Sequence, residues 1–489
     1  MRFTRVMSES SQDKKKESNK MGLEAFFKPK SVAVIGAARE PRKFGHVIFK
    51  NFARSEFKGK TYPVNPKAEN ILGFKVYPNL KEIPDEVDLA VIALPAPKVS
   101  SAIDDCLSKK VKAAVIISGG FKETGEKGEK LENEIKKKIT ASNLRIIGPN
   151  CIGIYDPTSH VDTLFLPTYR LTRPKLGATA FITQSGAFGA AILDWASSQD
   201  IGISKFISIG NKIDVDEVDL LNYLAEDSLT TCVTLYVESI ERGREFLKVA
   251  SKVVERKPLV VLKGGITPEG ANAALSHTGS MAGAANVYRG VFEQVGAVQA
   301  QNVDELFDYA RVLAYQPMPK AQTDLAIVTN GGGFGVISTD EASRLGIKLA
   351  SFNSETAKTL KENLPYYAIP RNPLDLVGDA DAERYRMALN AVASDPNVGV
   401  LLVIVLPQTS YIQSDVVDAI TECQVTYRKP IVVCAIGGDF TRVMAKMLEE
   451  EHIPTYVTPE RAIDAINALL MHRKVQEDKK KKQRIQATK

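Results

Sequence analysis

Membrane segments, secretion signals and paired cysteines are all missing from this sequence of 489 residues. No apolar run is long enough to cross a bilayer, and residues 1–20 contain no apolar core that could serve as a secretory signal. The five cysteines are scattered, without the close pairs of a metal site, and most lie in apolar, strand-like runs. The sequence therefore predicts a cytoplasmic protein with buried, reduced thiols and no membrane segment.

The net charge of +6 does not indicate a nucleic-acid-binding surface, because the positive charge lies at the two ends. Residues 1–20 carry +3 and residues 472–489 carry +6, which leaves −3 for the rest of the chain. We expect residues 1–24 and 472–489 to be disordered, solvated basic tails, and we expect no nucleic-acid partner.

Short apolar runs alternate with helical patterns along most of the chain, which predicts an α/β fold with parallel sheets covered on both faces. The runs occupy residues 31–36, 89–94, 113–118, 178–183, 232–237, 258–263, 325–330, 398–406 and 430–436. Proline-rich stretches at 155–177 and 315–324 interrupt this series. They predict three domains, at about residues 25–155, 175–315 and 324–470.

The second and third predicted domains open with related sequence, in which residues 183–189 (TQSGAFG) recur as 329–335 (TNGGGFG). One interpretation is convergent chemistry of strand–turn–helix units, since glycine is common at such turns. The other is a pair of similar helix N-termini, each presenting free backbone N–H groups to an anion. We favour the second interpretation, because the matches continue into the helix. It predicts phosphate-binding positions at Ser185, Gly186, Ala187, Gly331, Gly332 and Gly333.

The first predicted domain has the pattern of a nucleotide-binding unit but lacks two features of NAD sites. A buried strand ends at Gly36 and a helix is expected near Phe44, yet the turn between them is not G-x-G-x-x-G. No acidic residue follows the second strand to bind a ribose diol. Arg39, Arg42, Lys43 and Lys67 stand nearby instead, and they suit an additional phosphate, such as the 3′-phosphate of CoA. The alternative is a structural Rossmann-like unit with surface cations.

The later strand ends of this domain should line the same crevice. Taken together, the turn and the strand ends predict a CoA site that involves Gly36, Ala37, Arg39, Lys43, Phe44, Asn65, Lys67, Leu94, Pro95, Ser118, Gly119 and Asn150.

His277 is one of five histidines and lies in a segment rich in Gly, Ser, Thr and Ala. Such surroundings predict an exposed or mobile loop. A neutral imidazole nitrogen is a competent phosphoryl acceptor, although a plain surface histidine remains the alternative. Glu238 follows the apolar run at 232–237, where its carboxylate would orient the ring from the catalytic edge of the sheet.

The motifs V-x-G-A, Y-P-V-N-P-K, L-P-A-P, S-G-G-F and G-P-N, in this order, resemble the CoA-binding domain of succinyl-CoA synthetase and, more closely, archaeal ADP-forming acyl-CoA synthetases. S-H-T-G-S-M-A-G resembles their phosphohistidine loop, and Y-V-E resembles their histidine-orienting glutamate. The resemblance covers about residues 25–470. It implies a Rossmann-like CoA-binding domain followed by two flavodoxin-like domains, with His277 phosphorylated and held between the two helix starts.

The resemblance also implies a reaction, the reversible conversion of acyl-CoA, ADP and phosphate to acid, ATP and CoA through an acyl phosphate and a phosphohistidine. No part of the chain is a candidate for the ATP-grasp unit that this reaction needs. We therefore expect an ATP-grasp β subunit as partner, in an α₂β₂ assembly, with ATP or ADP and Mg²⁺ bound there and no metal on this chain. The acyl group of the carboxylic acid or acyl-CoA substrate is not predicted.

Other interpretations carry less support. A catalytically silent, CoA-binding regulatory subunit would be favoured by loss of His277 or Glu238, and both are present. The first turn disfavours an NAD-dependent dehydrogenase, and the chain has no length left for an acetyltransferase domain. The segment Pro370–Leu376 also resembles the family, but we assign it no role beyond a structural turn.

Overall fold

The structure is a computed structural model that describes residues 22–278, 284–320 and 324–487. The chain divides into two compact units, Met1–Val295 and Gly296–Lys489. The first unit contains two predominantly parallel sheets with their helices, and the second unit contains a third. None of the helices in the described part of the chain combines the length and the apolar character needed to span a membrane.

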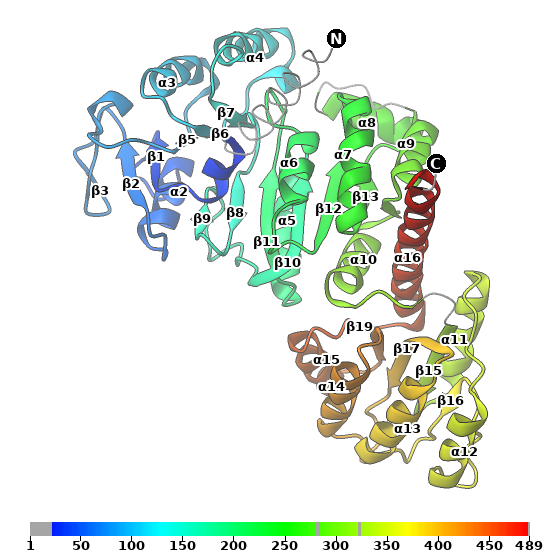
Figure 1. Cartoon of the computed structure of the whole chain (residues 1–489). Helices are drawn as coiled ribbons and strands as arrows, with labels where there is room; N and C mark the ends of the chain where they lie inside the picture. The colour runs from blue at the N-terminus through cyan, green and yellow to red at the C-terminus, as the bar shows by residue number, and fades with distance from the viewer. Residues whose placement is uncertain (1–21, 279–283, 321–323, 488–489) are drawn as a thin grey trace. The chain divides into compact units, whose positions relative to one another are not determined.

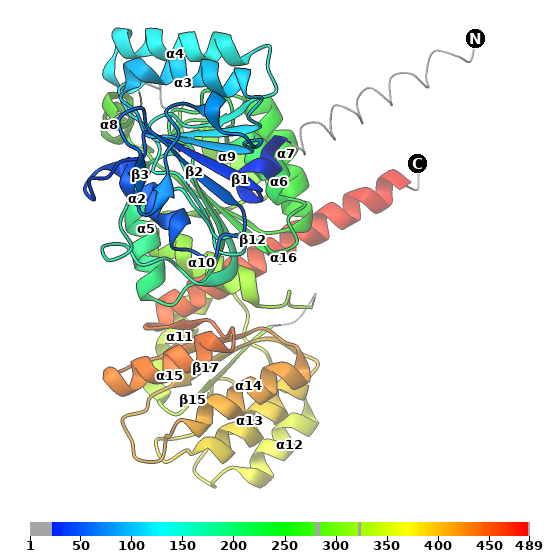
Figure 2. The ribbon, with the colours of Figure 1, turned by 90° about the vertical axis from the view of Figure 1, so that its left-hand side faces the viewer.

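The first sheet consists of parallel strands whose residues are mostly buried, as expected where helices cover both faces. The strand order is β2 (Lys60–Val64), β1 (Ser31–Ile35), β5 (Leu89–Ile92), β6 (Ala113–Ile116) and β7 (Arg145–Ile147). Helices α2 (Phe44–Ala53), α3 (Ala96–Ser108) and α4 (Glu126–Ile139) follow β1, β5 and β6. Figures 1 and 2 show α3 and α4 side by side over this sheet. Ligands of such sheets lie beyond the carboxyl ends of the strands.

The second sheet also belongs to the first unit. Strands β13 (Leu259–Lys263), β12 (Cys232–Val237), β10 (Leu176–Thr183) and β11 (Ile203–Ser208) are parallel neighbours in that order. Beyond β11 come β8 (Ile154–Asp156) and β9 (Val161–Asp162), and β8 runs antiparallel to β11, so this edge departs from the expected parallel arrangement. The helices are α5 (Gly186–Ser198), α6 (Glu217–Leu224), α7 (Gly243–Arg256), α8 (Pro268–Thr278) and α9 (Ala285–Val295).

The two sheets of the first unit are joined by the segment that follows β11. Val215 N–H donates to Ile146 O at 3.0 Å, and Ile146 N–H donates to the Asp214 carboxylate at 2.7 Å. Ile213 is buried in the hydrophobic core of the first sheet. Arg145 forms an ion pair with Asp214 at 3.0 Å. These contacts hold the segment that follows β11 alongside β7, from the first residues of that strand.

The second unit is built around a parallel sheet with the order β16 (Leu374–Asp375), β15 (Asp324–Thr329), β17 (Val398–Val405), β18 (Ile431–Ala435) and β19 (Thr455–Tyr456). Its helices are α10 (Val303–Tyr315), α11 (Gly332–Arg344), α12 (Ser354–Asn363), α13 (Ala382–Ser394), α14 (Asp415–Tyr427), α15 (Asp439–Glu450) and α16 (Pro459–Ala487). Figure 2 shows α12, α13 and α14 together on one side of the sheet.

A buried ion-pair cluster ties α10, α15 and α16 together in the second unit. Arg311 on α10 contacts Glu449 on α15 at 2.8 Å and Asp308 on its own helix at 3.1 Å. Arg461 on α16 contacts Asp308 at 2.7 Å. The Arg311 and Asp308 side chains are 10% and 3% exposed, so this cluster lies in the interior.

Each of the nine predicted apolar runs contains a strand, and all five cysteines are buried, as predicted. The expectation of disordered tails is contradicted at residues 472–487 and 22–24. Residues 472–487 continue α16, because Lys, Arg, Gln and Glu are good helix formers and the stretch has no Gly or Pro. Residues 22–27 are helical and Phe26 and Phe27 are fully buried, so the ordered chain begins before residue 25. Residues 1–21 lie outside the described part.

The expected loop around His277 differs from the structure in its described part. Residues Pro268–Thr278 form α8, since Pro268 suits a first helical turn and the alanines that follow favour a helix. Residues 279–283 lie outside the described residues.

Candidate active site

Both copies of the repeated segment fold as a strand, a tight turn and a helix, as predicted. β10 leads into α5 and β15 into α11, and each helix has 13 residues. The Thr183 hydroxyl donates to Ser185 O at 2.9 Å and accepts from Ser185 N–H at 3.1 Å. Thr329 and Gly331 make the same two contacts at 3.1 and 2.9 Å. The repeat is therefore one of local geometry, and each helix begins with backbone N–H groups that have no partner within the helix.

The residue after each threonine, Gln184 or Asn330, forms side-chain hydrogen bonds with the backbone just after the neighbouring strand. Gln184 Oε1 accepts from the N–H groups of Glu238 and Ser239 at 2.7 and 3.0 Å, and Gln184 Nε2 donates to Ser239 O at 2.6 Å. In the second unit, Asn330 accepts from Leu406 N–H at 2.9 Å and donates to Leu406 O at 3.0 Å. Both amides are buried. In the first unit this contact fixes the backbone of Glu238 beside the start of α5.

The Glu238 carboxylate has one oxygen with a partner and one without. Its Oε1 accepts from the Tyr236 hydroxyl at 3.3 Å. Burial and the nearby carboxylate raise the pKa of Tyr236 to about 12, so Tyr236 remains a donor at neutral pH. Oε2 is buried and accepts no hydrogen bond from the residues described. An unpartnered buried carboxylate oxygen is unfavourable, so this atom is a ready acceptor for an incoming donor.

A cavity of about 290 Å³ lies in the first unit between the carboxyl ends of the two sheets. Seven predicted site residues line it, from both predicted domains: Phe44, Gly119, Asn150, Ser185, Gly186, Ala187 and Glu238. The remaining lining residues are Ile117, Cys151, Ile152, Phe165, Gln184, Gly210 and Asn211. The N-terminus of α5 and the Glu238 carboxylate thus share one cavity with the strand-end loops of the first sheet.

The turn after β1 contacts the residues that follow β2. Gly36 has a φ of 92°, and a Cβ there would lie 2.4 Å from the backbone of the neighbouring strand. Asn65 Nδ2 donates to Ala37 O at 2.7 Å, and Arg39 donates to Lys67 O at 3.3 Å. Five predicted CoA-site residues are thereby brought together, and the Arg39 and Lys67 side chains are exposed.

The other strand-end loops of the first sheet are also connected. The Ser118 hydroxyl donates to Leu94 O, and Asn150 N–H donates to Ser118 O at 2.8 Å. Pro95 caps the start of α3, and Lys43 and Phe44 are exposed at the start of α2. All twelve predicted CoA-site residues therefore lie at the carboxyl edge of this sheet.

Asn211, which the sequence did not predict, connects the second sheet to this edge. Its Oδ1 accepts from Asn150 at 3.3 Å, and its Nδ2 donates to Glu123 at 2.7 Å and to Glu132 at 2.8 Å. Burial raises the pKa of Glu132, and the hydrogen bond from Asn211 makes this rise smaller. Burial alone would also raise the pKa of Glu123, but hydrogen bonds from Asn211 and from backbone N–H groups, including that of Gly120, hold it below its usual value. Asn211 therefore orients the Asn150 amide at the cavity.

His277 lies on α8, whose backbone is described while the side chain of His277 is not. α8 contacts the 3₁₀ turn η2 (Lys122–Thr124), which follows β6 of the first sheet. The helix that carries the histidine therefore lies against the same strand-end loops as the cavity. The pairing of His277 with Glu238 stays a prediction.

Gly331, Gly332 and Gly333 lie at the turn and the start of α11 in the second unit, as predicted. The Asp375 carboxylate lies against this helix start, since a Cβ at Gly332 would be 2.4 Å from Asp375 Oδ2. Within the described ranges, no cluster of His, Cys, Asp and Glu side chains could hold a metal ion.

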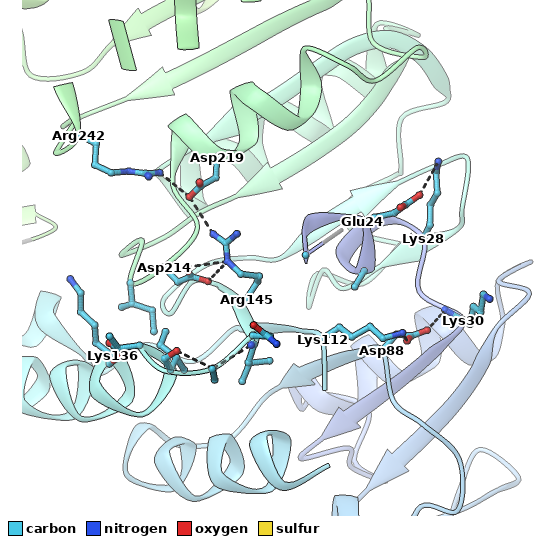
Figure 3. Close-up of a pocket in the computed structure, with 18 residues that line it drawn as sticks. Glu24, Lys28, Lys30, Asp88, Lys112, Lys136, Arg145, Asp214, Asp219 and Arg242 are labelled. Carbon is cyan, nitrogen blue, oxygen red and sulfur yellow. Dashed lines mark hydrogen bonds and ion pairs between the residues drawn. The ribbon is translucent and has the colours of Figure 1, made fainter. Parts of the chain in front are cut away.

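A larger cavity, of about 1140 Å³, lies at the opposite edge of the first sheet. Lys30, Asp88, Lys112 and Arg145, which line it, stand just before or at the starts of their strands. Figure 3 shows that many of its charged side chains are already paired with one another, for example Lys112 with Asp88. Since ligands of parallel sheets bind at the carboxyl edge, we place the active site in the smaller cavity.

Comparisons with known proteins identify the two domains of the first unit. Residues 30–157 match the family described as CoA binding domain, and residues 176–313 match the family described as succinyl-CoA ligase like flavodoxin domain. The chain is 40% identical to the alpha subunit of acetate–CoA ligase [ADP-forming] I of Pyrococcus furiosus, over 92% of this chain and 97% of the relative.

Two further relatives extend the comparison. The chain is 41% identical to acetate–CoA ligase [ADP-forming] I of Archaeoglobus fulgidus, over 93% of this chain but only 64% of the relative's length. A solved structure of acetyl-coenzyme A synthetase 1 from Candidatus Korarchaeum cryptofilum, in complex with phosphate and ADP, superposes with a TM-score of 0.88 at 38% identity, covering 93% of this chain and 97% of that chain. On this evidence the chain belongs to the ADP-forming acyl-CoA synthetase family, as a homologue of the alpha subunits of acetate–CoA ligases.

Proposed function

We propose that this chain is the CoA-binding, histidine-phosphorylated subunit of an ADP-forming acyl-CoA synthetase. The observation that carries the proposal is the shared cavity, in which the N-terminus of α5 and the unpartnered Glu238 Oε2 lie beside Asn150 and Gly119 of the CoA-binding domain. A phosphate donor or acceptor and a thioester would meet there.

CoA would bind along the carboxyl edge of the first sheet. Arg39, Lys43 and Lys67 are exposed at the turn after β1, where they would pair with the phosphates of CoA. The close approach of the Ala93 backbone at Gly36 leaves no room for a side chain, which explains why glycine stands at this turn. The loops at Leu94, Ser118 and Asn150 would lead the pantetheine arm toward the cavity.

The proposed chemistry has two transfers on this chain. A phosphate oxygen attacks the thioester carbonyl, the C–S bond breaks, and CoA leaves as an acyl phosphate forms. A ring nitrogen of His277 then attacks the phosphorus, the P–O bond to the acyl group breaks, and the carboxylic acid leaves. The N–H groups at the start of α5 would stabilise the negative charge of the phosphoryl group in both steps. The start of α11 would do the same for the phosphohistidine.

The remaining transfer, from the phosphohistidine to ADP, is assigned to a partner. The alpha-subunit relatives carry names that imply a second subunit, and this chain spans 97% of one of them. We propose an ATP-grasp β subunit, in an α₂β₂ assembly, that binds the nucleotide with Mg²⁺. The metal ion would neutralise charge on the nucleotide phosphates there.

The chain alone carries the groups for the first two transfers, which permits a direct test without nucleotide. After incubation with acetyl-CoA and ³²P-labelled phosphate, we expect acid-labile, alkali-stable label on the chain and release of CoA. Acetate plus CoA should discharge the label. If no label appears while calorimetry shows that CoA binds, the chain is a CoA-binding module without this chemistry, and the proposal is wrong.

Glu238→Gln should slow this labelling by about 10- to 100-fold, the usual effect of losing a carboxylate that orients a histidine. The amide can still accept from the ring N–H but no longer stabilises the imidazolium by charge. Quench-flow labelling measures the rate, and CoA affinity should be unchanged. Glu241→Gln, at an exposed carboxylate of the same loop, is the matched control. A Glu238→Gln rate equal to that of the control would remove Glu238 from the mechanism.

A further inference from the structure

The cavity that holds the proposed active site is lined by apolar as well as polar residues. Phe44, Phe165, Ile117 and Ile152 are the larger apolar ones, beside the polar groups at the start of α5 and at Glu238. The rings of Phe44 and Phe165 stack, with centroids 4.1 Å apart and planes 28° apart. The two rings come from different parts of the chain, because Phe44 starts α2 and Phe165 follows β9. Together they form a continuous aromatic wall.

The backbone is fixed on both sides of Phe165. Leu164 O accepts from Asn51 Nδ2 on α2 at 2.8 Å. Leu166 O accepts from Arg173 Nη2 at 2.8 Å, and Arg173 is itself held by Asp162 in an ion pair at 2.8 Å. Both of these charged side chains are only 10% exposed. Because the backbone on both sides of Phe165 is fixed, its ring should move little when a ligand binds. The ring therefore limits the space that is available to the ligand.

We propose that Phe165 is a specificity-determining residue, whose ring, stacked on Phe44, bounds the acyl subsite and restricts the substrate to short aliphatic acyl groups. The inference rests on the proposed function and deepens it. The acyl carbon must lie beside the phosphate at the start of α5, and the acyl chain would then pack against apolar residues of the same cavity, among them the stacked rings of Phe44 and Phe165. The cavity of about 290 Å³ must also hold the phosphate and the end of the CoA arm, which leaves room for a small group.

Replacing Phe165 with Ala removes one half of the wall and opens the subsite. Each methylene that a hydrophobic pocket accepts or rejects changes specificity by about 10- to 200-fold. We therefore expect the ratio of the labelling rate with phenylacetyl-CoA to the labelling rate with acetyl-CoA to rise by at least about tenfold in Phe165→Ala. The rise should come from faster use of the aryl substrate, while labelling with acetyl-CoA continues.

The experiment measures phosphate-dependent labelling of the chain by acetyl-CoA, isovaleryl-CoA and phenylacetyl-CoA, for the wild type, Phe165→Ala and Phe165→Leu. Phe165→Leu keeps an apolar side chain in the wall if the alanine variant folds poorly, and it should show a smaller shift in the same direction. Tyr169→Ala is the matched control, because Tyr169 is an aromatic residue of the same segment, is 79% exposed and does not line the cavity.

The possible outcomes distinguish failure of the role of Phe165 from failure of the proposed function on which it rests. No labelling of the wild type by any acyl-CoA would reject the proposed function itself. Labelling of the wild type by acetyl-CoA with an unchanged substrate ratio in both Phe165 variants would reject only the role of Phe165. The role of Phe165 would also be rejected if phenylacetyl-CoA labelled the wild type as efficiently as acetyl-CoA.

Discussion

The variant His277→Ala is expected to take up no label from acetyl-CoA and ³²P-labelled phosphate, and to support no ATP formation with an ATP-grasp partner. An alanine has no nucleophile, and none of the other proposed site residues can carry a phosphoryl group between two sites. CoA binding should be unchanged, because the predicted CoA contacts lie on the first sheet. Acyl phosphate formed at the cavity should then accumulate or hydrolyse, which hydroxylamine trapping would detect.

The control for this variant must show that loss of any histidine does not have the same effect. His160 is suitable, because it lies outside the cavity and its side chain is 40% exposed. Its φ of 57° favours asparagine over alanine as the replacement. His160→Asn should be labelled at the wild-type rate. Stable label on the His277→Ala chain would mean that another residue carries the phosphate.

The second large effect is on stability. Arg311→Met should lower the free energy of unfolding of the second unit by about 3–5 kcal/mol, the range for breaking a buried ion pair. Glu449 would lose the cation that faces it at 2.8 Å, while Asp308 would keep only Arg461. Hydrogen exchange of the β17 and β18 amides would measure the loss. Arg344→Met is the control, because the Arg344 side chain is 63% exposed and an ion pair of such an exposed side chain contributes little to stability.

The destabilisation should grow with pH. Burial raises the pKa of Glu449, and Arg311 opposes this rise. Without Arg311, the folded-state pKa of Glu449 should move further above its unfolded value. A folded state that binds the proton more tightly is favoured at low pH and loses that advantage as pH rises through the folded pKa. The difference between Arg311→Met and wild type should therefore be smaller at pH 5 than at pH 8. An equal difference at both values would exclude Glu449 as the cause.

The sheets were predictable where strands are continuously apolar, and the prediction failed where a charge interrupts the middle of a strand. β11 was missed because Lys205 interrupts its apolar pattern. In the structure the Lys205 side chain is 2% exposed and pairs with Asp156 and Asp227. Those partners lie far away in the sequence, so local pattern could not reveal that the lysine is neutralised and buried. For the same reason Asn211, which follows β11, was not recognised.

The local geometry of the candidate site was predictable where it depends on adjacent residues. The threonine turn, the helix starts and Glu238 each follow from a few adjacent residues, and those of the first unit line one cavity. The role of Phe165 could not be predicted from adjacent residues. Phe165 lies in a proline-rich stretch whose sequence is typical of a linker between domains. Its role depends on stacking against Phe44, 121 positions earlier in the chain by numbering, and on backbone contacts from Asn51 and Arg173.

The burial of Ile213 in the core of the first sheet has a consequence for how the sequences of such proteins diverge in evolution. Residues 30–157 and 176–313 match two separate families, as if each were an independently heritable module. Yet the second module supplies a side chain to the first module's interior, and Asp214 supplies a hydrogen-bond acceptor to β7. A gene rearrangement that exchanged one module alone would replace only half of this joint. The two modules are therefore expected to be inherited together. Selection should act jointly on the residues of both modules that form these contacts.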